Sequence, residues 1–164
     1  MSAVELMLEL TLCEIIKKDR ILLKRASRGV SKGKWNGLGG RLEKGETPEE
    51  GILREVFEES GLRATSPEKV GILNFYVSDR AHPYGRCHLF MIRSFEGTPT
   101  SGDEGELKWF QMDKIPYEKM WDDDRYWLRH ALDGKKFDAE FVFDGQRMER
   151  IKEFSVVNLH YSTT

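Results

Sequence analysis

One short segment, residues 47–61, constrains the fold most because it carries the signals for both ends of a helix. Thr47 and Glu50 have the spacing of a capping box, in which each side chain accepts a hydrogen bond from the other residue's backbone N–H. Pro48 suits the first helical position, and Gly61 suits the left-handed residue that follows a helix. The pattern therefore predicts a helix that ends just before this glycine.

The segments around this helix have the pattern of strands. Leu6, Leu8, Leu10 and Leu12 alternate with other residues, which is the period of a half-buried strand. A glycine-rich loop with a short strand inside it is expected over residues 29–45. Further strands are predicted at 21–23, 69–78, 86–94, 108–112, 137–143 and 151–157, and a second helix at 123–132. This order predicts an α+β fold with helices on a mixed sheet.

The composition limits the class of protein. The chain has 164 residues, no internal repeat and no long linker, so we expect a single domain over 1–164. Its 26 basic and 28 acidic side chains give a net charge of −2, which argues against a stable nucleic-acid partner. No apolar run approaches the roughly 20 residues of a membrane span, so no membrane partner is expected. The start lacks a basic signal region, and Cys13 and Cys87 are expected to be reduced, so we expect a cytoplasmic protein.

The charges are unevenly distributed along the chain. Residues 17–34 contain eight Lys or Arg against one Asp, whereas residues 43–59 contain seven Glu against one Lys and one Arg. A basic side of this kind attracts phosphates, and an acidic side holds a metal ion. A polyanionic substrate is therefore compatible with the small net charge.

Three glutamates form one face of the predicted first helix. Glu55, Glu58 and Glu59 are spaced i, i+3 and i+4, where like charges repel one another. The face expected to pack on the core carries Ile52, Leu53, Val56 and Phe57. A solvated acidic face is one interpretation of the three glutamates. The other is a divalent cation held by hard oxygen ligands, which suits Mg²⁺, with Mn²⁺ as a substitute.

A longer pattern favours the metal site. Residues 40–62 fit G-x5-E-x7-R-E-U-x-E-E-x-G-U, where U is apolar, without any departure. This pattern resembles the signature of the Nudix hydrolases. The resemblance implies the Nudix fold, a mixed β-sheet sandwiched between helices (an α/β/α sandwich). It also implies cleavage of a nucleoside diphosphate linked to another group.

The resemblance and the charges together suggest roles for the motif residues. We expect Glu55 and Glu59 to be the main metal ligands, with Glu58 and the Gly39 carbonyl sharing that role. Glu104 is expected to be a general base or a further ligand. Arg54 is expected to position the carboxylates, and Glu46 to hold the loop against the helix.

Two other stretches contain side chains that suit a nucleobase. Trp121 can stack on a base, Asn36 can donate and accept at a purine edge, and a protonated Asp can do both as well. Ordinary structural roles are the alternative, with Asn36 in a turn, Trp121 in the core and residues 122–124 capping a helix.

Residues 8–148 are also similar to the oxidised-purine nucleoside triphosphatases of the MutT type. The similarity implies that Asn36, Asp123 and Asp124 grip the base and that Trp121 stacks on it. It also places four residues at family pocket positions, namely Thr11, Leu12, Phe75 and Phe143. The implied reaction converts 8-oxo-dGTP or 2-oxo-dATP to the monophosphate and pyrophosphate, which would sanitise the nucleotide pool.

Four residues depart from that family pattern and leave the preferred base open. Val30 and Val77 replace aromatic residues, Ala26 replaces a lysine, and Asp122 replaces a proline. The alternative substrates are normal purine triphosphates and the 5′-triphosphate end of RNA. A catalytically inactive binding module is a further alternative, although such modules usually lose a metal carboxylate. We expect a monomer, because no exposed apolar heptad or long edge strand stands out.

Overall fold

The computed structural model describes residues 7–103 and 105–160, with the side chains of 158–160 excepted. Its strands are β1 (Leu8–Lys17), β2 (Arg20–Ala26), β3 (Trp35–Asn36), β4 (Leu38–Arg41), β5 (Arg63–Thr65), β6 (Glu68–Val77), β7 (Pro83–Ile92), β8 (Ser94–Glu96), β9 (Gly105–Gln111), β10 (Lys136–Phe143) and β11 (Ile151–His160). Its helices are α1 (Pro48–Ser60), α2 (Asp124–Leu132) and the short 3₁₀ turns η2 (Met112–Lys114) and η3 (Tyr117–Lys119).

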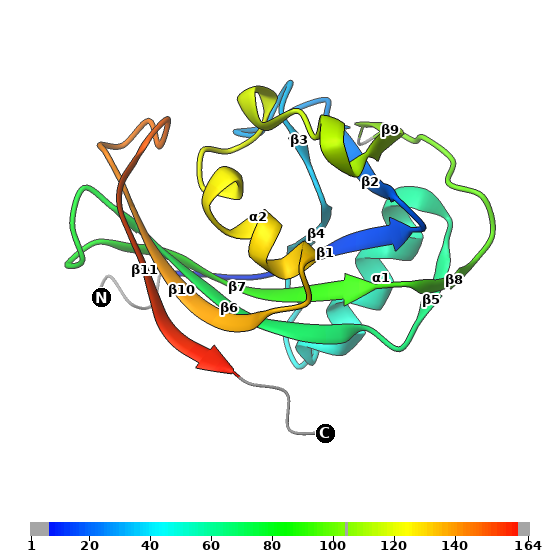
Figure 1. Ribbon diagram of the computed structural model, residues 1–164, viewed down its shortest axis with the longest axis horizontal. Coiled ribbons are helices and arrows are strands. Elements are labelled where there is room, and N and C mark those ends of the chain that lie inside the picture. Colours follow the sequence, from blue (N-terminus) through cyan, green and yellow to red (C-terminus); the bar gives the residue numbers. More distant parts are fainter. Residues whose placement is uncertain (1–6, 104, 161–164) are drawn as a thin grey trace.

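A nine-stranded mixed sheet forms the centre of the molecule (Figure 1). Its main path runs β11-β10-β6-β7-β1-β2-β3, with β4 paired to β1 and β9 paired to β2. The β1–β7 and β10–β6 pairs are parallel, and the other strand pairs of this sheet are antiparallel. β5 and β8 make a separate two-stranded sheet.

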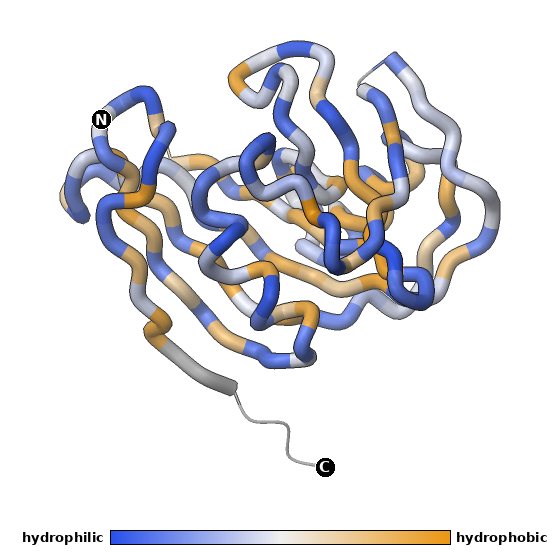
Figure 2. Tube along the Cα trace, turned by 45° about the horizontal axis from the view of Figure 1, so that its top comes forward, coloured by the Kyte–Doolittle hydropathy of each residue, from blue (hydrophilic) through white to orange (hydrophobic). Residues whose placement is uncertain are grey.

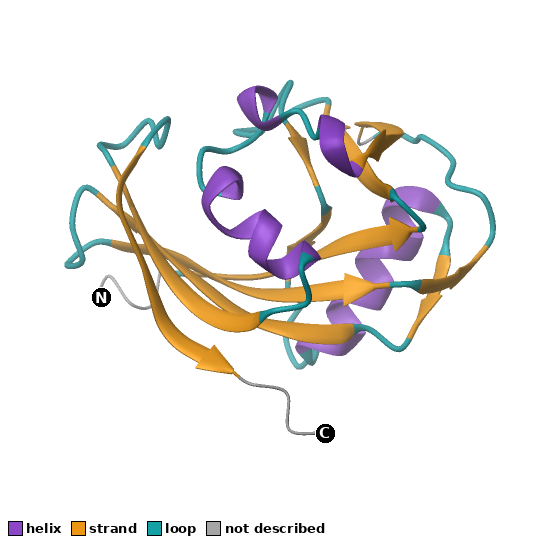
Figure 3. Ribbon diagram, viewed as in Figure 1, coloured by secondary structure: helices purple, strands orange, loops and turns teal. Residues whose placement is uncertain are grey.

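The helices cover opposite faces of the sheet, as Figure 3 shows. Alternation along β1 sends Cys13 and Ile15 into the core under α1, and sends Leu12 and Ile16 toward the core under α2. Apolar residues accordingly follow the central strands in Figure 2. The structure is an α/β/α sandwich with two apolar cores, one on each face of the sheet.

The first helix forms where its local signals predict it. The Thr47 hydroxyl accepts from the Glu50 N–H, the Glu50 carboxylate accepts from the Thr47 N–H, and Gly61 has a φ of 78°. Ile52 and Val56 are buried as expected. The prediction for Phe57 is wrong, because its side chain is 47% exposed and lies against the Arg63 guanidinium.

Strand boundaries differ from prediction where pairing, which is a long-range property, decides them. β2 extends well beyond the apolar run 21–23, because it pairs with β9 along its length and with β3 at its end. β7 begins at Pro83, inside the predicted turn, because Pro83 pairs with Tyr76 of β6. Leu6, which was assigned to the first strand, lies outside the described residues.

No helix in the described part of the chain has the length and apolar character needed to cross a membrane. Cys13 and Cys87 are both buried free cysteines, and no disulfide joins them.

Candidate active site

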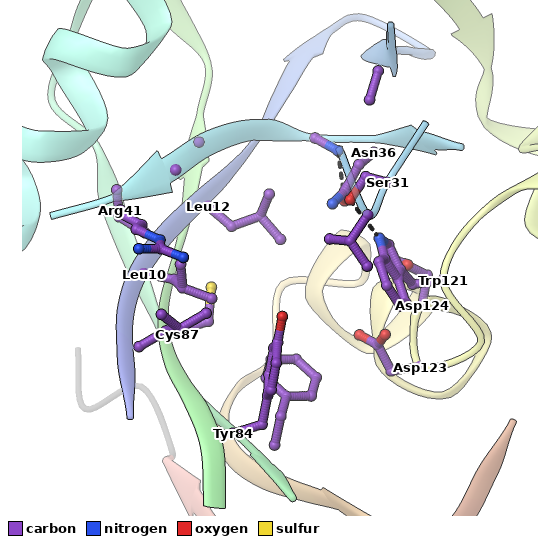
Figure 4. Close-up of a pocket in the computed structure, with 18 of the residues that line it drawn as sticks. Leu10, Leu12, Ser31, Asn36, Arg41, Tyr84, Cys87, Trp121, Asp123 and Asp124 are labelled. Atoms are coloured by element: carbon purple, nitrogen blue, oxygen red, sulfur yellow. Dashed lines mark hydrogen bonds between the residues drawn. The ribbon is translucent and has the colours of Figure 1, made fainter. Parts of the chain in front are cut away.

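A cavity of about 340 Å³ lies between the central sheet and the segments that precede α2. This volume lies within the usual range for small-molecule sites. All eight residues predicted to contact the base line it, namely Thr11, Leu12, Asn36, Phe75, Trp121, Asp123, Asp124 and Phe143. Figure 4 shows Asn36, Trp121 and Asp124 on one side of the cavity, with Leu10, Leu12 and Cys87 opposite.

Sheet topology brings the apolar part of this lining together. Thr11 and Leu12 come from β1, and the β10–β6 pairing places Phe75 beside Phe141 in register. The Phe75 ring also stacks against that of Phe143 at 6.0 Å, and Trp121 meets Phe143 edge-on at 6.2 Å. The cavity therefore has an aromatic wall assembled from three distant stretches of sequence.

The loop between β2 and β3 closes another side of the cavity. The Ser31 hydroxyl accepts a hydrogen bond from Trp121 Nε1 at 3.1 Å, and the Lys34 ammonium lies 5.3 Å from the centroid of the Trp121 ring system. Val30 and Ala26, two of the departures from the family pattern, line the cavity here. Val30 is 66% exposed, so its side chain contributes little enclosure.

Two buried acids, Asp123 and Asp124, lie at one end of the cavity, which we call the base end because a base is expected to bind there. Trp127 Nε1 donates to Asp123 Oδ2 at 2.7 Å, whereas Asp124 Oδ1 has no hydrogen-bond partner among the described residues. Burial raises the pKa of Asp123 to about 6 and raises that of Asp124 well above its usual range. Burial therefore favours the protonated form of Asp124, which is able to donate as well as accept.

Asp122, which replaces a proline of the family pattern, does not line the cavity, although its charge contributes to the raised pKa of Asp123. Its carboxylate accepts from the Ile151 N–H at 2.7 Å and pairs with Arg125, so it ties α2 to β11. Val77 also falls outside the lining. The helix-cap alternative is wrong for Asp123, which precedes α2 without making a side-chain cap hydrogen bond.

A third buried acid, Glu14 of β1, lies behind this end of the cavity. Its side chain is fully buried, and neither carboxyl oxygen has a hydrogen-bond partner in the described structure. A Cβ on Gly37 would lie 2.8 Å from Glu14 Oε1, so only glycine fits there without displacement. Burial raises the pKa of Glu14 to about 8, which keeps this group neutral at pH 7.

The other end of the cavity meets the acidic face of α1. Arg54 binds Glu46 through Nε and Nη2, at 2.6 and 3.0 Å, and donates through Nη1 to Glu55 and Glu58 at 3.0 and 3.1 Å. Its hydrogen bonds hold the pKa of Glu46 at about 2. One guanidinium thus contacts three carboxylates, those of Glu46, Glu55 and Glu58.

Glu59 is the most buried of the three helix glutamates. Its Oε1 accepts from the Gly39 N–H at 2.9 Å, and its Oε2 accepts from the Lys24 ammonium. Burial raises the pKa of Glu59 to about 7, and the attraction of Lys24 opposes that rise. The backbone of Gly39 therefore lies directly against a carboxylate proposed to bind metal.

The glycine loop approaches α1 closely because it has no side chains there. A Cβ on Gly40 would lie 2.7 Å from Glu55 Oε1. The carboxylates of Glu55 and Glu59 therefore lie directly behind the glycine loop that lines the cavity, and carboxylate oxygens are hard ligands that suit a divalent cation. In the described part of the chain, no group of three His, Cys, Asp or Glu side chains is already placed to hold a metal ion, and the α1 carboxylates contact Arg54 and Lys24. Glu104 lies outside the described residues.

Several cavity residues were not predicted. The lining also includes Leu10, Lys24, Arg41, Tyr84, Cys87 and Met148. Leu10 shares the alternation of Leu12, which was a usable signal. Lys24 had none, because its contact with Glu59 spans 35 positions of the sequence.

Comparison with known proteins assigns this fold and motif to a family. The model of the NUDIX domain matches residues 11–131. The chain belongs to the Nudix family and is a Nudix hydrolase, as its motif implied. A requirement for divalent metal is typical of these enzymes.

Named relatives extend over most of the chain. The oxidized purine nucleoside triphosphate hydrolase of Mus musculus is 40% identical over 136 residues, which cover 83% of this chain and 86% of that protein. The protein of the same name from Danio rerio is 39% identical over the same shares. A crystal structure of a MutT protein from Bacillus halodurans has a TM-score of 0.81 and 24% identity, covering 92% of this chain and 98% of that one. That likeness confirms the predicted fold class.

Proposed function

We propose that this chain hydrolyses oxidised purine nucleoside triphosphates, of the 8-oxo-dGTP and 2-oxo-dATP class, to the monophosphate and pyrophosphate. One observation carries the proposal: a single cavity joins Asn36, Asp123 and Asp124 to the glycine loop beside the acidic face of α1. A base held at one end places its phosphates toward the other. The two relatives named for this activity support the same substrate class.

The base end suits a purine with donors and acceptors along its edge. Asn36 has its Oδ1 engaged by the Gly37 N–H at 2.9 Å, which fixes the orientation of its amide. Burial favours the protonated form of Asp124 more strongly than that of Asp123, so the pair is able to present a donor and acceptors together. Trp121 offers a ring face for stacking, and the aromatic wall excludes water. The pool-sanitising role follows from a preference for damaged bases.

The phosphate end suits metal-dependent hydrolysis. We assign Glu55, Glu58, Glu59 and the Gly39 carbonyl as the groups that would hold Mg²⁺, with Mn²⁺ as a substitute. Glu104 would act as general base or further ligand. The bound cation supplies a polarised phosphoryl group and a more acidic water. Arg54 keeps the carboxylates aligned, and the glycine loop admits phosphate oxygens to them.

The remaining assignments concern the state of the whole chain. We propose a single domain over 1–164 that acts on a small-molecule nucleotide, as a monomer in the cytoplasm, without a stable nucleic-acid partner. The first strand, β1, and the last strand, β11, belong to the same sheet, which supports one folding unit. The net charge of −2 supports the absence of a stable nucleic-acid partner, and the two free cysteines support the cytoplasmic assignment. Light scattering after size-exclusion chromatography tests the oligomeric state.

A nucleotide panel tests the proposed function. With Mg²⁺ present, kcat/KM is measured for 8-oxo-dGTP against dGTP, for 2-oxo-dATP against dATP, and for a short 5′-triphosphorylated RNA. We expect the oxidised member of at least one pair to be preferred, with pyrophosphate as a product. If no oxidised purine exceeds its normal counterpart, the substrate assignment fails. A preference for the RNA would select the alternative substrate instead.

A further inference from the structure

Lys24 lies where the cavity meets the acidic face of α1. It belongs to β2, where its backbone pairs with Asn36 of β3 and Leu107 of β9. Its side chain is 16% exposed and lines the cavity, and its ammonium contacts Glu59 Oε2. No other part of the mechanism proposed above uses this charge.

The contact between Lys24 and Glu59 completes a pattern in which the cations of the chain itself neutralise the α1 carboxylates. Arg54 binds Glu55 and Glu58, while Lys24 binds Glu59. Arg54 is also held by Glu46 and by the Arg41 carbonyl, so it has a fixed scaffold. The described hydrogen bonds and ion pairs of the Lys24 ammonium are to Glu59 alone.

A divalent cation and the Lys24 ammonium cannot both approach Glu59 Oε2 closely. Like charges a few ångströms apart repel strongly where water is partly excluded. Both oxygens of Glu59 are engaged, Oε1 by the backbone N–H of Gly39 and Oε2 by the Lys24 ammonium. Because a side chain moves away more easily than a strand backbone, Oε2 is the oxygen more available to a metal ion. A cation that binds there must displace the ammonium.

The displaced ammonium can reach the cavity. The stem of Lys24 packs against β9 in its present position, where a Cβ on Gly105 would lie 3.1 Å from Lys24 Cγ. Lys24 shares the cavity lining with Gly39, Gly40 and Arg41, where the phosphates of a bound nucleotide would lie. Four methylenes let the ammonium move while its backbone stays in the sheet.

We propose that Lys24 is an exchangeable counter-cation, paired with Glu59 in the resting protein and transferred to the triphosphate when a divalent cation takes its place on Glu59. In the resting state its ammonium is the partner of a buried carboxylate. In the loaded state it binds phosphate oxygens. This inference rests on the proposed metal-dependent hydrolysis and adds a residue that the family motif does not contain.

Acylation of lysines followed by mass spectrometry tests the exchange directly. The intact protein is pulsed with acetic anhydride alone, with Mg²⁺, and with Mg²⁺ plus guanosine 5′-(α,β-imido)triphosphate. Lys108, an exposed lysine of the neighbouring strand β9, serves as the internal reference. We expect Mg²⁺ to increase Lys24 acylation several-fold relative to Lys108, and the nucleotide to reverse the increase. A Lys24 rate that does not respond to Mg²⁺ overturns the exchange.

Substitution separates phosphate contact from simple shielding by the nucleotide. Lys24→Met should raise KM for the triphosphate about tenfold or more, because a charged hydrogen bond is lost. Affinity for the phosphate-free nucleoside 8-oxo-deoxyguanosine should be unchanged, Lys24→Arg should retain most of the wild-type KM, and Lys108→Met should leave both values at wild type. Equal weakening of nucleoside and triphosphate binding would assign Lys24 a purely structural role. If the wild-type protein hydrolyses no triphosphate with Mg²⁺, the proposed function itself fails.

Discussion

Carboxyl side chains near the two ends of the cavity have opposite surroundings. The α1 carboxylates face Arg54 and Lys24, whereas Glu14, Asp123 and Asp124 are buried without a cation paired to them in the described structure. Lys24 opposes the rise in pKa that burial causes at Glu59, whereas no cation in the described structure opposes that rise at Glu14 or Asp124. One end is therefore suited to hold metal and phosphate, and the other to exchange hydrogen bonds with a neutral base.

The largest expected effect is loss of turnover at the cation-paired end. Glu59→Gln keeps the shape of the side chain and removes its charge, so we expect kcat to fall by about 10³-fold or more, since a metal ligand contributes several kcal/mol. Glu49→Gln, in the exposed first turn of the same helix, is the matched control. Circular dichroism should show an intact fold in both variants. Wild-type activity in Glu59→Gln would contradict the metal assignment.

A second substitution tests the protonated end. Asp124→Ala should lower kcat/KM for an oxidised purine by about 10- to 100-fold, the cost of one or two hydrogen bonds to a buried partner. Asp124→Asn should retain much of the activity, because an amide has both a donor and an acceptor, like a neutral carboxyl. Steady-state kinetics at pH 7 compare the two. Equal losses would show that Asp124 acts as an anion.

Only part of this comparison could be predicted from the sequence. The acidic face of α1 follows from local spacing and caps, which neighbouring residues determine. The base-end residues were predicted through family resemblance, and all eight line one cavity. Which acids are paired with a cation and which are buried alone could not be predicted, because long-range packing decides it. In the sequence, Glu14 is an ordinary polar residue of a strand, and only the folded sheet buries it beneath α2. The exposure of Phe57 has the same origin, since helix periodicity shows a face without showing where its packing ends.

The pH dependence of stability should distinguish Glu14 from the exposed acids. Its pKa rises from 4.5 to about 8 on folding, so its contribution to stability is complete below pH 4.5 and is lost as the pH rises toward 8. Between pH 5 and 7 the free energy of unfolding should fall by roughly 2–3 kcal/mol from this group, somewhat over 1 kcal/mol per pH unit. Glu14→Gln should remove that part of the slope in urea denaturation.

Glu9, on the same strand, provides the opposite case. Hydrogen bonding to Arg86 lowers the pKa of Glu9, so its contribution is present above the usual pKa and is lost as the pH falls. Glu9→Gln should therefore change the slope in the opposite direction and by less, because the pair is exposed. Stability curves for Glu14→Gln that run parallel to wild type would contradict the burial argument.

The smallest expected effect concerns the loop between β2 and β3, which contacts Trp121. Ser31→Ala removes the acceptor of Trp121 Nε1, a partly buried contact worth about 0.5–1.5 kcal/mol. We expect KM for the purine triphosphate to rise by about two- to tenfold with little change in kcat. Ser27→Ala is the comparison variant. Ser27 lies in the same loop as Ser31, and its hydroxyl donates to the Asp103 carbonyl rather than to Trp121. A change in kcat without a change in KM would contradict this expectation and would show that the loop acts in a step after binding.

The two parallel strand pairs also determine the order in which the molecule can assemble. β1 pairs with β7 about 75 residues away, and β6 pairs with β10 about 66 residues away, so both contacts require large loops to close first. α1 and its capping contacts, by comparison, are local. We expect a chain still emerging from the ribosome to form the motif helix early. The contact between Phe75 and Phe143 forms only once β10 has been synthesised, so this wall of the cavity is among the last parts of the fold to appear.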